Sequence, residues 1–592
     1  MSDPIKHVVV LLLENRSFDQ MLGCFSEIYQ GLDGIDRASS SKNLLLSGGA
    51  AGKQTEFFQA ETRLRQMPWQ KPNIWDPHHE VSHIHTQLNG PVDNPGPMSG
   101  FVADFVGSYP DSTDEARQYI MSYYPLGFLP ALHALGRDFT ICDRWFSSLP
   151  GPTWPNRFFA LSGTASGRVD MPGDETYRID IPGYFHQTQL TIFDRLSEAG
   201  IHWKSYFHDI PQSWVMQRPR LARNVARYFY IGEFFADARG HADDFPKFCY
   251  IEPDFLGFQQ NDDHPPHDVM KGEKLVADVY NAIRENTELW QSTLLVVFFD
   301  EHGGFYDHVY PPKAVPPDAP SAPKHPLLSE MLAQLNPWHK PAETYSFDQL
   351  GVRVPALLVS PWAKRGVAKI NGESPIFDHT SLLKYLTDKW NLGSLGLRTA
   401  AANSIGALIA DQPRPDEDMA VRIDMPSLPP VDPELEDAAF GITEHDKGLL
   451  QLATYLKTAW LEPQALAEEA AVEAVPRVGT LLSRLFEGVM QVLMRGTRRL
   501  SSQATRRRPR ASRSAPDKIH TDTVSARDDV ASFVARRKRQ AIPLLAADIK
   551  LEGTKADHAV RALASMTGRP FHHHRERARQ QAMDWLKSHG HG

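Results

Sequence analysis

Two short apolar runs, each followed directly by a carboxylate, constrain the fold of this chain more than any other feature. Val8–Leu13 is followed by Glu14, and Leu294–Phe299 is followed by Asp300. Continuous apolar runs of this length are typical of strands that are buried on both faces of a parallel sheet. Because the carboxyl ends of parallel strands lie on the same side of a sheet, we expect the two acidic residues to meet in a single crevice.

Other strand and helix patterns extend these two runs to a doubly wound α/β domain. Further strand-like runs occur at Phe248–Glu252 and Ala356–Ser360, and helical patterns lie at Gly272–Asn286, Thr191–Ala199 and Ser381–Lys389. This alternation predicts a mostly parallel sheet with helices on both faces. The chain has 592 residues, too many for one ordinary core, so an appended region is also expected.

The composition changes near Trp460. We therefore predict a catalytic domain at 1–460 and a mainly helical, basic region at 461–592, with an uncertainty of about 15 residues. Within that region Val478–Met494 repeats apolar residues on one helical face, and an arginine-rich run follows from Arg495 to Arg513. Three interpretations stay open: binding to a membrane surface, packing on the catalytic domain or in a homo-oligomer, and disorder. A regulatory role, in which the region covers the site until a membrane docks, is a further possibility.

Charge and hydropathy exclude some classes of protein. The formal net charge of −9 is mild and argues against nucleic acid as the main partner. No stretch approaches the roughly 20 apolar residues that span a bilayer. Val8–Leu13 ends in Glu-Asn-Arg, unlike a signal peptide, so we expect no cleavable signal peptide and either a cytoplasmic chain or export by a leaderless route. Cys24, Cys142 and Cys249 are widely spaced, which predicts buried, unpaired thiols.

Polar residues at the two strand ends suit a cation. Asp300 and Glu301 precede a Gly-Gly turn, and Glu14 and Asn15 have the same setting after the first strand. Carboxylate and amide oxygens are ligands of divalent ions, although either pair alone also fits a turn with a helix cap. His302 is assigned to the turn and not to the metal.

A proline-rich loop surrounds a threonine. Pro150, Pro152 and Pro155 restrict the backbone on both sides of Thr153, and Arg157 follows four residues later. A hydroxyl held beside a metal loses its proton more readily and can attack phosphorus. The alternative is an ordinary structural loop.

Histidines concentrate in two places. Asn261–His267 contains two acids and two imidazoles, of which His264 is the stronger candidate for a site residue and His267 the weaker. Trp75–Glu80 is followed by His83 and His85, which fit either a metal pair or a helix surface. Lone histidines elsewhere, His208 and His379, are most often structural.

Four of these segments, in this order, resemble one family. They are Glu14-Asn-Arg-Ser-Phe-Asp19, Pro150-Gly-Pro-Thr-Trp-Pro-Asn-Arg157, Asn261-Asp-Asp-His-Pro265 and Asp300-Glu-His-Gly-Gly-Phe-Tyr-Asp-His308. Together they resemble the bacterial phospholipase C and acid phosphatase family, which includes plant non-specific phospholipases C and belongs to the alkaline phosphatase-like superfamily. The resemblance spans roughly residues 5–400 and leaves out the basic region.

The resemblance implies a doubly wound α/β fold and a set of roles for named residues. The metal ligands carry over to Glu14, Asn15, Asp300, Glu301 and the nucleophile Thr153. Residues in contact with the phosphate carry over to His79, His208, His264 and Arg157, and His264 and His79 also become catalytic candidates. The match around His208 is the poorest of these.

The resemblance also implies an activity. Acid phosphatases of this kind tend to carry serine where this chain has Thr153, and phospholipases C tend to carry threonine. We therefore expect a metal-dependent phospholipase C that cleaves glycerophospholipids of the phosphatidylcholine type into diacylglycerol and a phosphorylated head group. The surrounding histidines favour zinc, with calcium or another divalent ion as the alternative. A phosphomonoesterase with the same site, and a non-enzymatic effector that binds membrane or a partner through its basic tail, are the competing functions.

Overall fold

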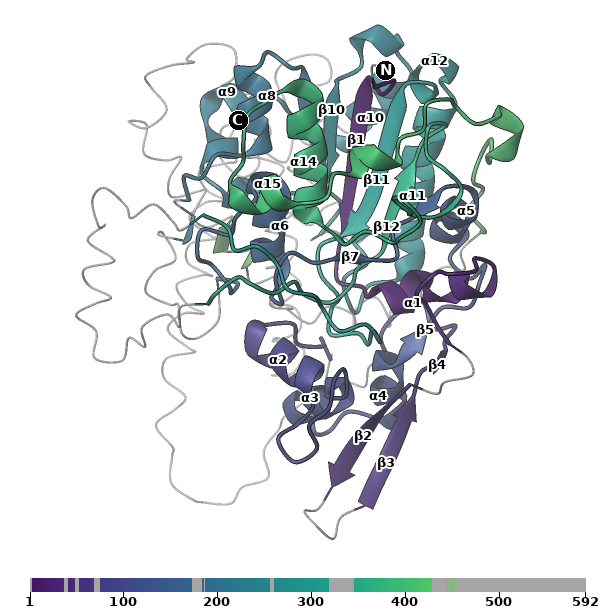
Figure 1. The fold of residues 1–592 in the computed structure, drawn as a ribbon, viewed down its shortest axis with the longest axis vertical. Helices are drawn as coiled ribbons and strands as arrows, with labels where there is room; N and C mark the ends of the chain where they lie inside the picture. Colours follow the sequence, from purple (N-terminus) through teal and green to yellow (C-terminus); the bar gives the residue numbers. More distant parts are fainter. Residues whose placement is uncertain are drawn as a thin grey trace, which may run out of the picture. The chain divides into compact units, whose positions relative to one another are not determined.

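An eight-stranded sheet forms the centre of the protein in this computed structural model (Figure 1). From one edge to the other the strands are β13 (Gly366–Val367), β6 (Thr140–Ile141), β12 (Ala356–Val359), β11 (Thr293–Phe299), β1 (His7–Leu13), β10 (Phe248–Ile251), β8 (Trp203–Phe207) and β9 (Tyr228–Tyr230). β12 runs antiparallel to both of its neighbours, and every other pairing in this sheet is parallel. The predicted mostly parallel α/β fold is confirmed.

The structure describes residues 3–36, 41–47, 53–68, 75–172, 184–185, 187–255, 260–318, 345–427, 445, 448–449 and 451–452. Chain contacts separate a first unit, Met1–Leu500, from a second, Ser501–Gly592. All described residues belong to the first unit. The predicted boundary near 460, the helix predicted at Val478–Met494 and the arginine-rich run lie outside the described residues and stay predictions.

Helices cover both faces of the sheet. α11 (Val269–Arg284) contacts β11 and α5 (Pro130–Asp138) on one face, while α14 (His379–Trp390) contacts α6 (Thr153–Ser162) on the other. Figure 1 shows the two pairs on opposite sides of the purple strand β1. The other α-helices in the described residues are α1 (Phe18–Leu22), α2 (Val81–Asn89), α3 (Phe101–Ser108), α4 (Asp114–Ile120), α8 (Ile192–Glu198), α9 (Ala222–Val225), α10 (Ile231–Ala238), α12 (Thr287–Trp290) and α15 (Leu397–Ala401).

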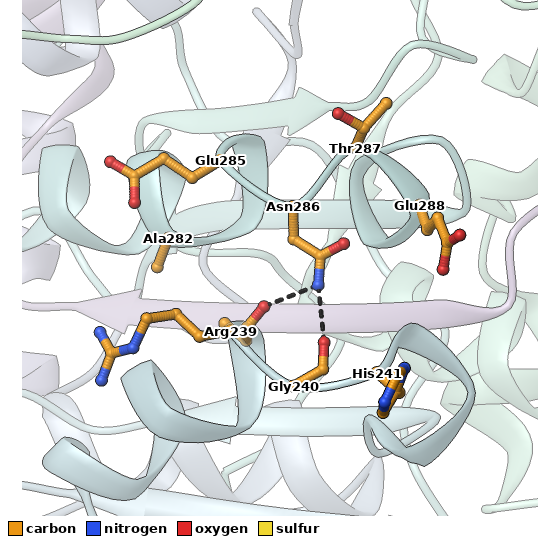
Figure 2. Close-up of a pocket in the computed structure, with 9 residues that line it drawn as sticks. Arg239, Gly240, His241, Ala282, Glu285, Asn286, Thr287 and Glu288 are labelled. Atoms are coloured by element: carbon orange, nitrogen blue, oxygen red, sulfur yellow. Dashed lines mark hydrogen bonds between the residues drawn. The ribbon is translucent and has the colours of Figure 1, made fainter.

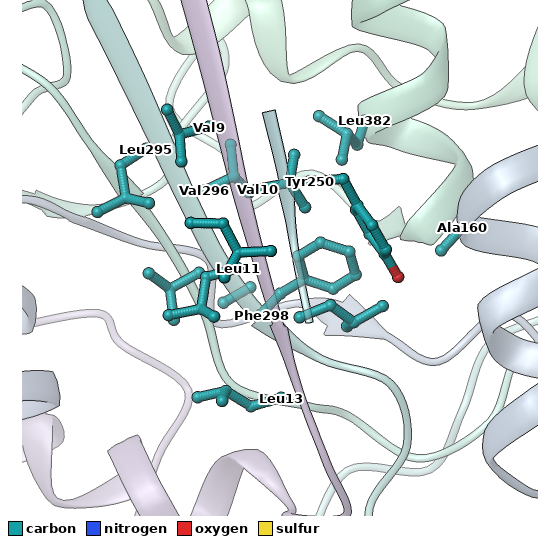
Figure 3. Packing of buried hydrophobic residues seen from close by; sticks show 14 of the residues in the cluster. Val9, Val10, Leu11, Leu13, Ala160, Tyr250, Leu295, Val296, Phe298 and Leu382 are labelled. Carbon is teal, nitrogen blue, oxygen red and sulfur yellow. The ribbon is translucent and has the colours of Figure 1, made fainter. Parts of the chain in front are cut away.

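The main core lies around β1. Figure 3 shows side chains on both faces of β1: Val9 lies beside Leu295 of β11 on one face, and Val10 lies on the other face, the side of Leu382 of α14. All four of these side chains are buried. Burial of a Val, Leu or Phe side chain stabilises a fold by about 1.5–3 kcal/mol, so continuously apolar strands at the centre of the sheet anchor everything that follows them. No helix in the described part of the chain has both the length and the apolar character needed to cross a bilayer.

A smaller core lies beside the carboxyl ends of these strands. It contains residues of α2, α3 and α4 together with Phe305 and Tyr306, which follow β11 in the chain. In the described residues, three short sheets accompany the main one: β2 (Lys42–Ser47) with β3 (Lys53–Phe58), β4 (Ala60–Glu61) with β5 (Ser122–Tyr123), and β7 (Trp145–Phe146) with β14 (Phe377–Asp378). This lobe supplies histidines to the crevice described next.

Candidate active site

The two carboxylate-bearing turns meet as the sequence predicted. Leu13 pairs with Phe299 across β1 and β11, so Glu14 and Asp300 leave the sheet at the same edge. The Asn15 backbone N–H donates a hydrogen bond of 3.2 Å to Asp300 Oδ1. Asn15 has a φ of 56°, a left-handed conformation that asparagine tolerates better than most residues.

A glycine makes this close approach possible. Gly303 has a φ of +64°, and a Cβ atom there would lie 2.2 Å from the Asn15 carbonyl oxygen. The backbone N–H of Gly303 also donates to Glu301 Oε2 at 2.7 Å. The Gly-Gly turn therefore both orients Glu301 and lets the turn after β11 lie against the turn after β1.

Arg157 joins the two strand ends. Its Nη2 lies 3.0 Å from Glu14 Oε1, and its Nε donates to Asp300 Oδ2 at 2.9 Å. Burial raises the pKa of Glu14 well above its ordinary value and the pKa of Asp300 to about 6, and the guanidinium counteracts both shifts. Arg157 Nη1 has no hydrogen-bond partner among the described residues, so this donor can serve an anion at the strand ends.

Thr153 is the first residue of α6 and is fully buried. Its hydroxyl donates to Asn15 Oδ1 at 3.3 Å. The loop before it is fixed by Asn156, whose side-chain amide donates to the carbonyls of Leu149, Gly151 and Pro152. The hydroxyl therefore sits at the positive end of a helix, where negative charge is stabilised.

Two of the predicted histidines lie together at the same crevice. The rings of His79 and His264 have centroids 6.1 Å apart. His264 Nδ1 lies 2.5 Å from the Pro265 carbonyl oxygen, while its Nε2 is buried without a hydrogen-bond partner. His79 Nδ1 lies 3.9 Å from Glu301 Oε1.

The surroundings shift the pKa values of these imidazoles in opposite directions. Burial tends to lower the pKa of His79, but the carboxylates of Glu301, Glu80 and Asp76 outweigh it and raise this pKa to about 10. Burial, reinforced by neighbouring histidines, lowers the pKa of His264 well below its ordinary value. The two rings thus differ in their tendency to carry a proton.

Other histidines have structural partners. His208 Nδ1 lies 3.0 Å from the Glu252 carbonyl oxygen, and burial lowers its pKa. His302 Nε2 lies 2.8 Å from Gln87 Oε1, in agreement with its assignment to the turn. His267 Nδ1 lies 2.6 Å from Asp262 Oδ1, and His379 Nε2 lies 2.7 Å from the Asp300 carbonyl oxygen.

Three residues at the crevice were not predicted: His445, Asp262 and Gln212. His445 Nδ1 lies 3.2 Å from Glu14 Oε2, and its ring stacks on that of His264 at 5.5 Å. The Gln212 amide donates to Glu14 Oε1 at 2.7 Å. Asp262 lies within the Asn-Asp-Asp-His motif, which could have pointed to it, whereas the lone His445 in Thr-Glu-His-Asp-Lys has no local signal.

The donor atoms of the crevice fit a divalent cation. Among the described residues, the buried carboxylate oxygens Asp262 Oδ2 and Glu301 Oε1 lack hydrogen-bond partners, and Glu14 Oε2 faces His445 Nδ1 at 3.2 Å. In the described part of the chain, the group around Glu14 whose possible ligand atoms all lie within 4.8 Å of one another consists of Glu14, Asp262 and His445. Orphaned buried oxygens of this kind are costly without a cation or hydrogen-bond donor.

A second acidic cluster nearby is structural. Asp19, Asp307 and His308 also lie close together, but Arg353 donates to both carboxylates at 2.9 Å. His308 Nδ1 lies 2.8 Å from Asp19 Oδ2, and its Nε2 lies 3.0 Å from Asp33 Oδ1. This ion-pair network ties the turn after β11 to α1.

A surface hollow of about 660 Å³ lies elsewhere on the protein (Figure 2). Asn286 spans its wall and donates hydrogen bonds to the carbonyls of Ala238 and Gly240. The hollow is formed around the ends of α10 and α11 and around α12, which precedes the amino end of β11. The hollow therefore lies near the amino ends of the strands, whereas the crevice lies at their carboxyl ends.

Comparisons with known proteins show the family of this chain. The sequence profile described as the Phosphoesterase family matches residues 5–393. The chain belongs to this phosphoesterase family. Non-specific phospholipase C3 of Arabidopsis thaliana is 31% identical over 77% of this chain and 83% of its own length. Phospholipase C A of Mycobacterium tuberculosis is 30% identical over 67% and 77%.

This phosphoesterase is accordingly a phosphoric ester hydrolase, as predicted. A solved structure of a protein in the alkaline phosphatase superfamily from Vibrio parahaemolyticus aligns with 12% identity and a TM-score of 0.25, covering 56% of this chain and 81% of the other. At that level the alignment adds nothing to the fold, which the sheet and its helices define.

Proposed function

We propose that this phosphoesterase is a metal-dependent phospholipase C that uses Thr153 as its nucleophile. The observation that carries the proposal is the position of the Thr153 hydroxyl. It is buried at the start of α6, contacts Asn15 at 3.3 Å, and lies four residues before the arginine that joins Glu14 to Asp300. The carboxyl ends of the strands thus bring together an oxygen nucleophile, donors that can bind an anion, and carboxylates that can bind a cation.

A phospholipid is the proposed substrate. Relatives from a plant and a bacterium are both named phospholipase C, and their alignments extend over most of their own length. We propose glycerophospholipids of the phosphatidylcholine type, cleaved between glycerol and phosphate to give diacylglycerol and a phosphorylated head group. The threonine at the nucleophile position supports this choice over a phosphomonoesterase.

The residues that would hold a divalent ion, for which we propose zinc, are Glu14, Asn15, Asp300, Glu301 and Thr153. When bound, such an ion offsets phosphate charge and makes a neighbouring hydroxyl more acidic. Glu301 Oε1, which lacks a hydrogen-bond partner among the described residues, is the oxygen that most needs that charge.

The chain's own residues account for the remaining steps. Thr153 Oγ1 attacks phosphorus, and the bond from phosphorus to the glycerol oxygen breaks. The free Nη1 of Arg157 and the amino end of α6 face the negative charge of the phosphoryl group. The neutral imidazole of His264 takes the hydroxyl proton of Thr153, and His79, whose carboxylate neighbours favour its protonated form, supplies the proton to the departing oxygen of diacylglycerol. Water then hydrolyses the phosphothreonine and releases the phosphorylated head group: the proton of the water restores His79, and His264 returns its proton to Thr153.

Replacement of the nucleophile tests the proposal. Thr153→Ala is expected to reduce hydrolysis of phosphatidylcholine by at least about 10⁴-fold, since removal of a nucleophile has effects of that order, with the circular dichroism spectrum unchanged. Thr153→Ser should keep part of the activity. Thr86→Ala, the same deletion on the surface of α2, is the matched control and should behave like the wild type.

Full activity of Thr153→Ala would falsify the assignment of the nucleophile. The substrate class is read separately, by comparing phosphatidylcholine with p-nitrophenyl phosphate. A clear preference for the monoester would identify a phosphomonoesterase that uses the same site.

A further inference from the structure

A cluster of two histidines and a glutamate, outside the proposed catalytic residues, lies at the start of α2. His78, Glu80 and His83 offer possible ligand atoms that all lie within 4.8 Å of one another. The three side chains are 26%, 17% and 32% exposed, respectively, so an ion can reach them from solvent. The rings of His78 and His83 stack with centroids 4.4 Å apart.

Hydrogen bonds fix the tautomers of both histidines. His83 Nδ1 lies 2.8 Å from Asp104 Oδ1, and His78 Nδ1 lies 3.2 Å from Glu80 Oε2. Because an ionised carboxylate only accepts hydrogen bonds, each Nδ1 is the donor and each Nε2 keeps its lone pair. In metal sites a carboxylate that is not itself a ligand orients a histidine through the opposite ring nitrogen, as Asp104 does for His83. Glu80 has to leave His78 Nδ1 in order to bind the ion.

The cluster is connected to the proposed catalytic residues through His79. The backbone N–H of His79 donates to Glu80 Oε2 at 3.2 Å. If Glu80 becomes a ligand, the loop that carries the His79 imidazole has to adjust.

A second connection runs through buried side chains. Asp104 accepts from His83 on one oxygen and from the Gln87 amide, at 2.9 Å, on the other. Gln87 Oε1 accepts from His302 at 2.8 Å, and His302 Nδ1 lies 3.3 Å from Glu301 Oε2. Because His302 Nε2–H donates to Gln87, His302 Nδ1 carries no proton and makes no hydrogen bond to a described residue. The hydrogen-bonded chain from His83 therefore ends at His302, the residue that follows Glu301 in the sequence.

We propose that His78, Glu80 and His83 form a peripheral binding site for a zinc-class divalent cation, and that occupancy of this site lowers turnover at the active site. Two imidazole nitrogens and one carboxylate are a donor set that zinc and copper favour over calcium or magnesium. Withdrawal of Glu80 from His79 displaces an imidazole that the proposed mechanism uses. Only this effect on turnover rests on the proposed function.

Copper binding to the full-length protein, loaded with its active-site ion, tests the site itself. Electron paramagnetic resonance of Cu²⁺ added in increments should show a component with nitrogen coupling in the wild type that His83→Gln loses. His85→Gln, which removes an exposed imidazole two residues away on the same helix, is the matched control and should retain it. Ions bound by other histidines contribute equally to all three proteins and cancel in the difference spectra.

Asp104→Asn keeps every ligand but removes the carboxylate that orients His83. It should weaken Cu²⁺ binding about 10–100-fold, which keeps the proposal testable if His83→Gln folds poorly. Spectra and affinities that are the same for wild type, His83→Gln and Asp104→Asn would overturn the proposed site.

Coupling is measured by adding zinc during turnover. Micromolar Zn²⁺ should inhibit the wild type and His85→Gln at least about twofold more than His83→Gln. Equal inhibition of all three proteins would refute the coupling. Cu²⁺ binding at the cluster in a protein that does not hydrolyse phosphatidylcholine would count against the proposed function and leave the site standing.

Discussion

At the scale of single residues, His445 has the most specific set of contacts that the sequence did not reveal. The Gln212 amide lies 2.6 Å from His445 Nε2, while Nδ1 faces Glu14 Oε2. Since the Gln212 amide donates there, Nε2 accepts and Nδ1 carries the proton toward Glu14. His445 thereby positions a carboxylate that we expect to be a metal ligand.

Two amide substitutions separate the roles of the two ring nitrogens. His445→Asn places an N–H donor near the position of Nδ1, and His445→Gln places one near the position of Nε2. We expect the Asn variant to keep most of its metal affinity and the Gln variant to lose about 10–100-fold, the range typical of residues that orient metal ligands. Titration calorimetry of the metal-free proteins with Zn²⁺ provides the measurement. Equal affinities in the two variants would show that His445 does not orient Glu14.

Residues that directly follow apolar strands could be predicted, and residues brought in by loops could not. Glu14 and Asp300 come immediately after runs that are recognisably strands, so their meeting follows from sheet geometry alone. His445 lies 145 positions beyond Asp300 in a polar stretch with no periodicity. His302, which the sequence analysis assigned to the turn, contacts Gln87 of α2 at 2.8 Å, and its exclusion from the metal stays a prediction.

At the scale of elements, the Gly-Gly turn after β11 controls the approach of two strand ends. An alanine at position 303 would bring its Cβ within 2.2 Å of the Asn15 carbonyl oxygen and would adopt a φ of +64°. The left-handed conformation alone costs about 1–2 kcal/mol for a residue with a Cβ. We expect Gly303→Ala to lower the free energy of unfolding by more than this, and to reduce turnover at least about tenfold because Asn15 and Glu301 move.

The matched control for this variant is Gly107→Ala in α3. A Cβ there meets nothing within 4 Å, so the free energy of unfolding should rise by about 0.5–1 kcal/mol with turnover unchanged. Urea denaturation and steady-state assays measure both. A Gly303→Ala protein as active and stable as Gly107→Ala would contradict the role given to the turn.

The ion-pair network between the turn after β11 and α1 predicts a pH dependence of stability. Burial tends to lower the pKa of His308, but the Asp19 and Asp33 carboxylates outweigh it and raise the pKa to about 10. A folded-state pKa above the unfolded value of about 6.5 means that this stabilisation is complete below pH 6.5. It is lost as the pH rises through about 10.

Comparison of the wild type with His308→Gln isolates this contribution. The wild type should be more stable by about 1–3 kcal/mol at pH 7, and the difference should shrink as the pH approaches 10. Thermal unfolding at a series of pH values measures it, and His241→Gln on the surface is the control. A difference that stays constant over this range would show that His308 is not charged in the folded state.

The sequence predicted the positions of the strands more accurately than the direction in which neighbouring strands pair. The strands at Val8–Leu13, Phe248–Glu252, Leu294–Phe299 and Ala356–Ser360 all form within a residue or two of the predicted bounds. β12 nevertheless runs antiparallel to β11, because direction depends on the path of the connecting segment. β6 and β13 contain two residues each, too few to leave a periodic pattern.

At the scale of the whole molecule, the region beyond 460 carries the prediction of membrane association. The apolar face of Val478–Met494 and the arginine-rich run after it are typical of a surface-binding segment. Removal of residues 461–592 is expected to reduce hydrolysis of phosphatidylcholine in anionic vesicles several-fold, because the basic side chains attract such surfaces. Hydrolysis of a soluble p-nitrophenyl ester should be unchanged. Unchanged activity on both substrates would argue against a membrane role for this region.

The order of strands in the main sheet has a consequence for synthesis on the ribosome. In the described residues, the strands that pair with β1 are β10 and β11, which come much later in the chain. The apolar segment His7–Leu13 therefore leaves the ribosome long before either partner has been synthesised. From His7 to Phe248 is 248 − 7 = 241 residues, or about 12–48 s at the usual elongation rate of about 5–20 residues per second. During that interval the segment has the composition of an aggregation-prone strand. We expect chaperones that bind exposed apolar segments to keep it from aggregating.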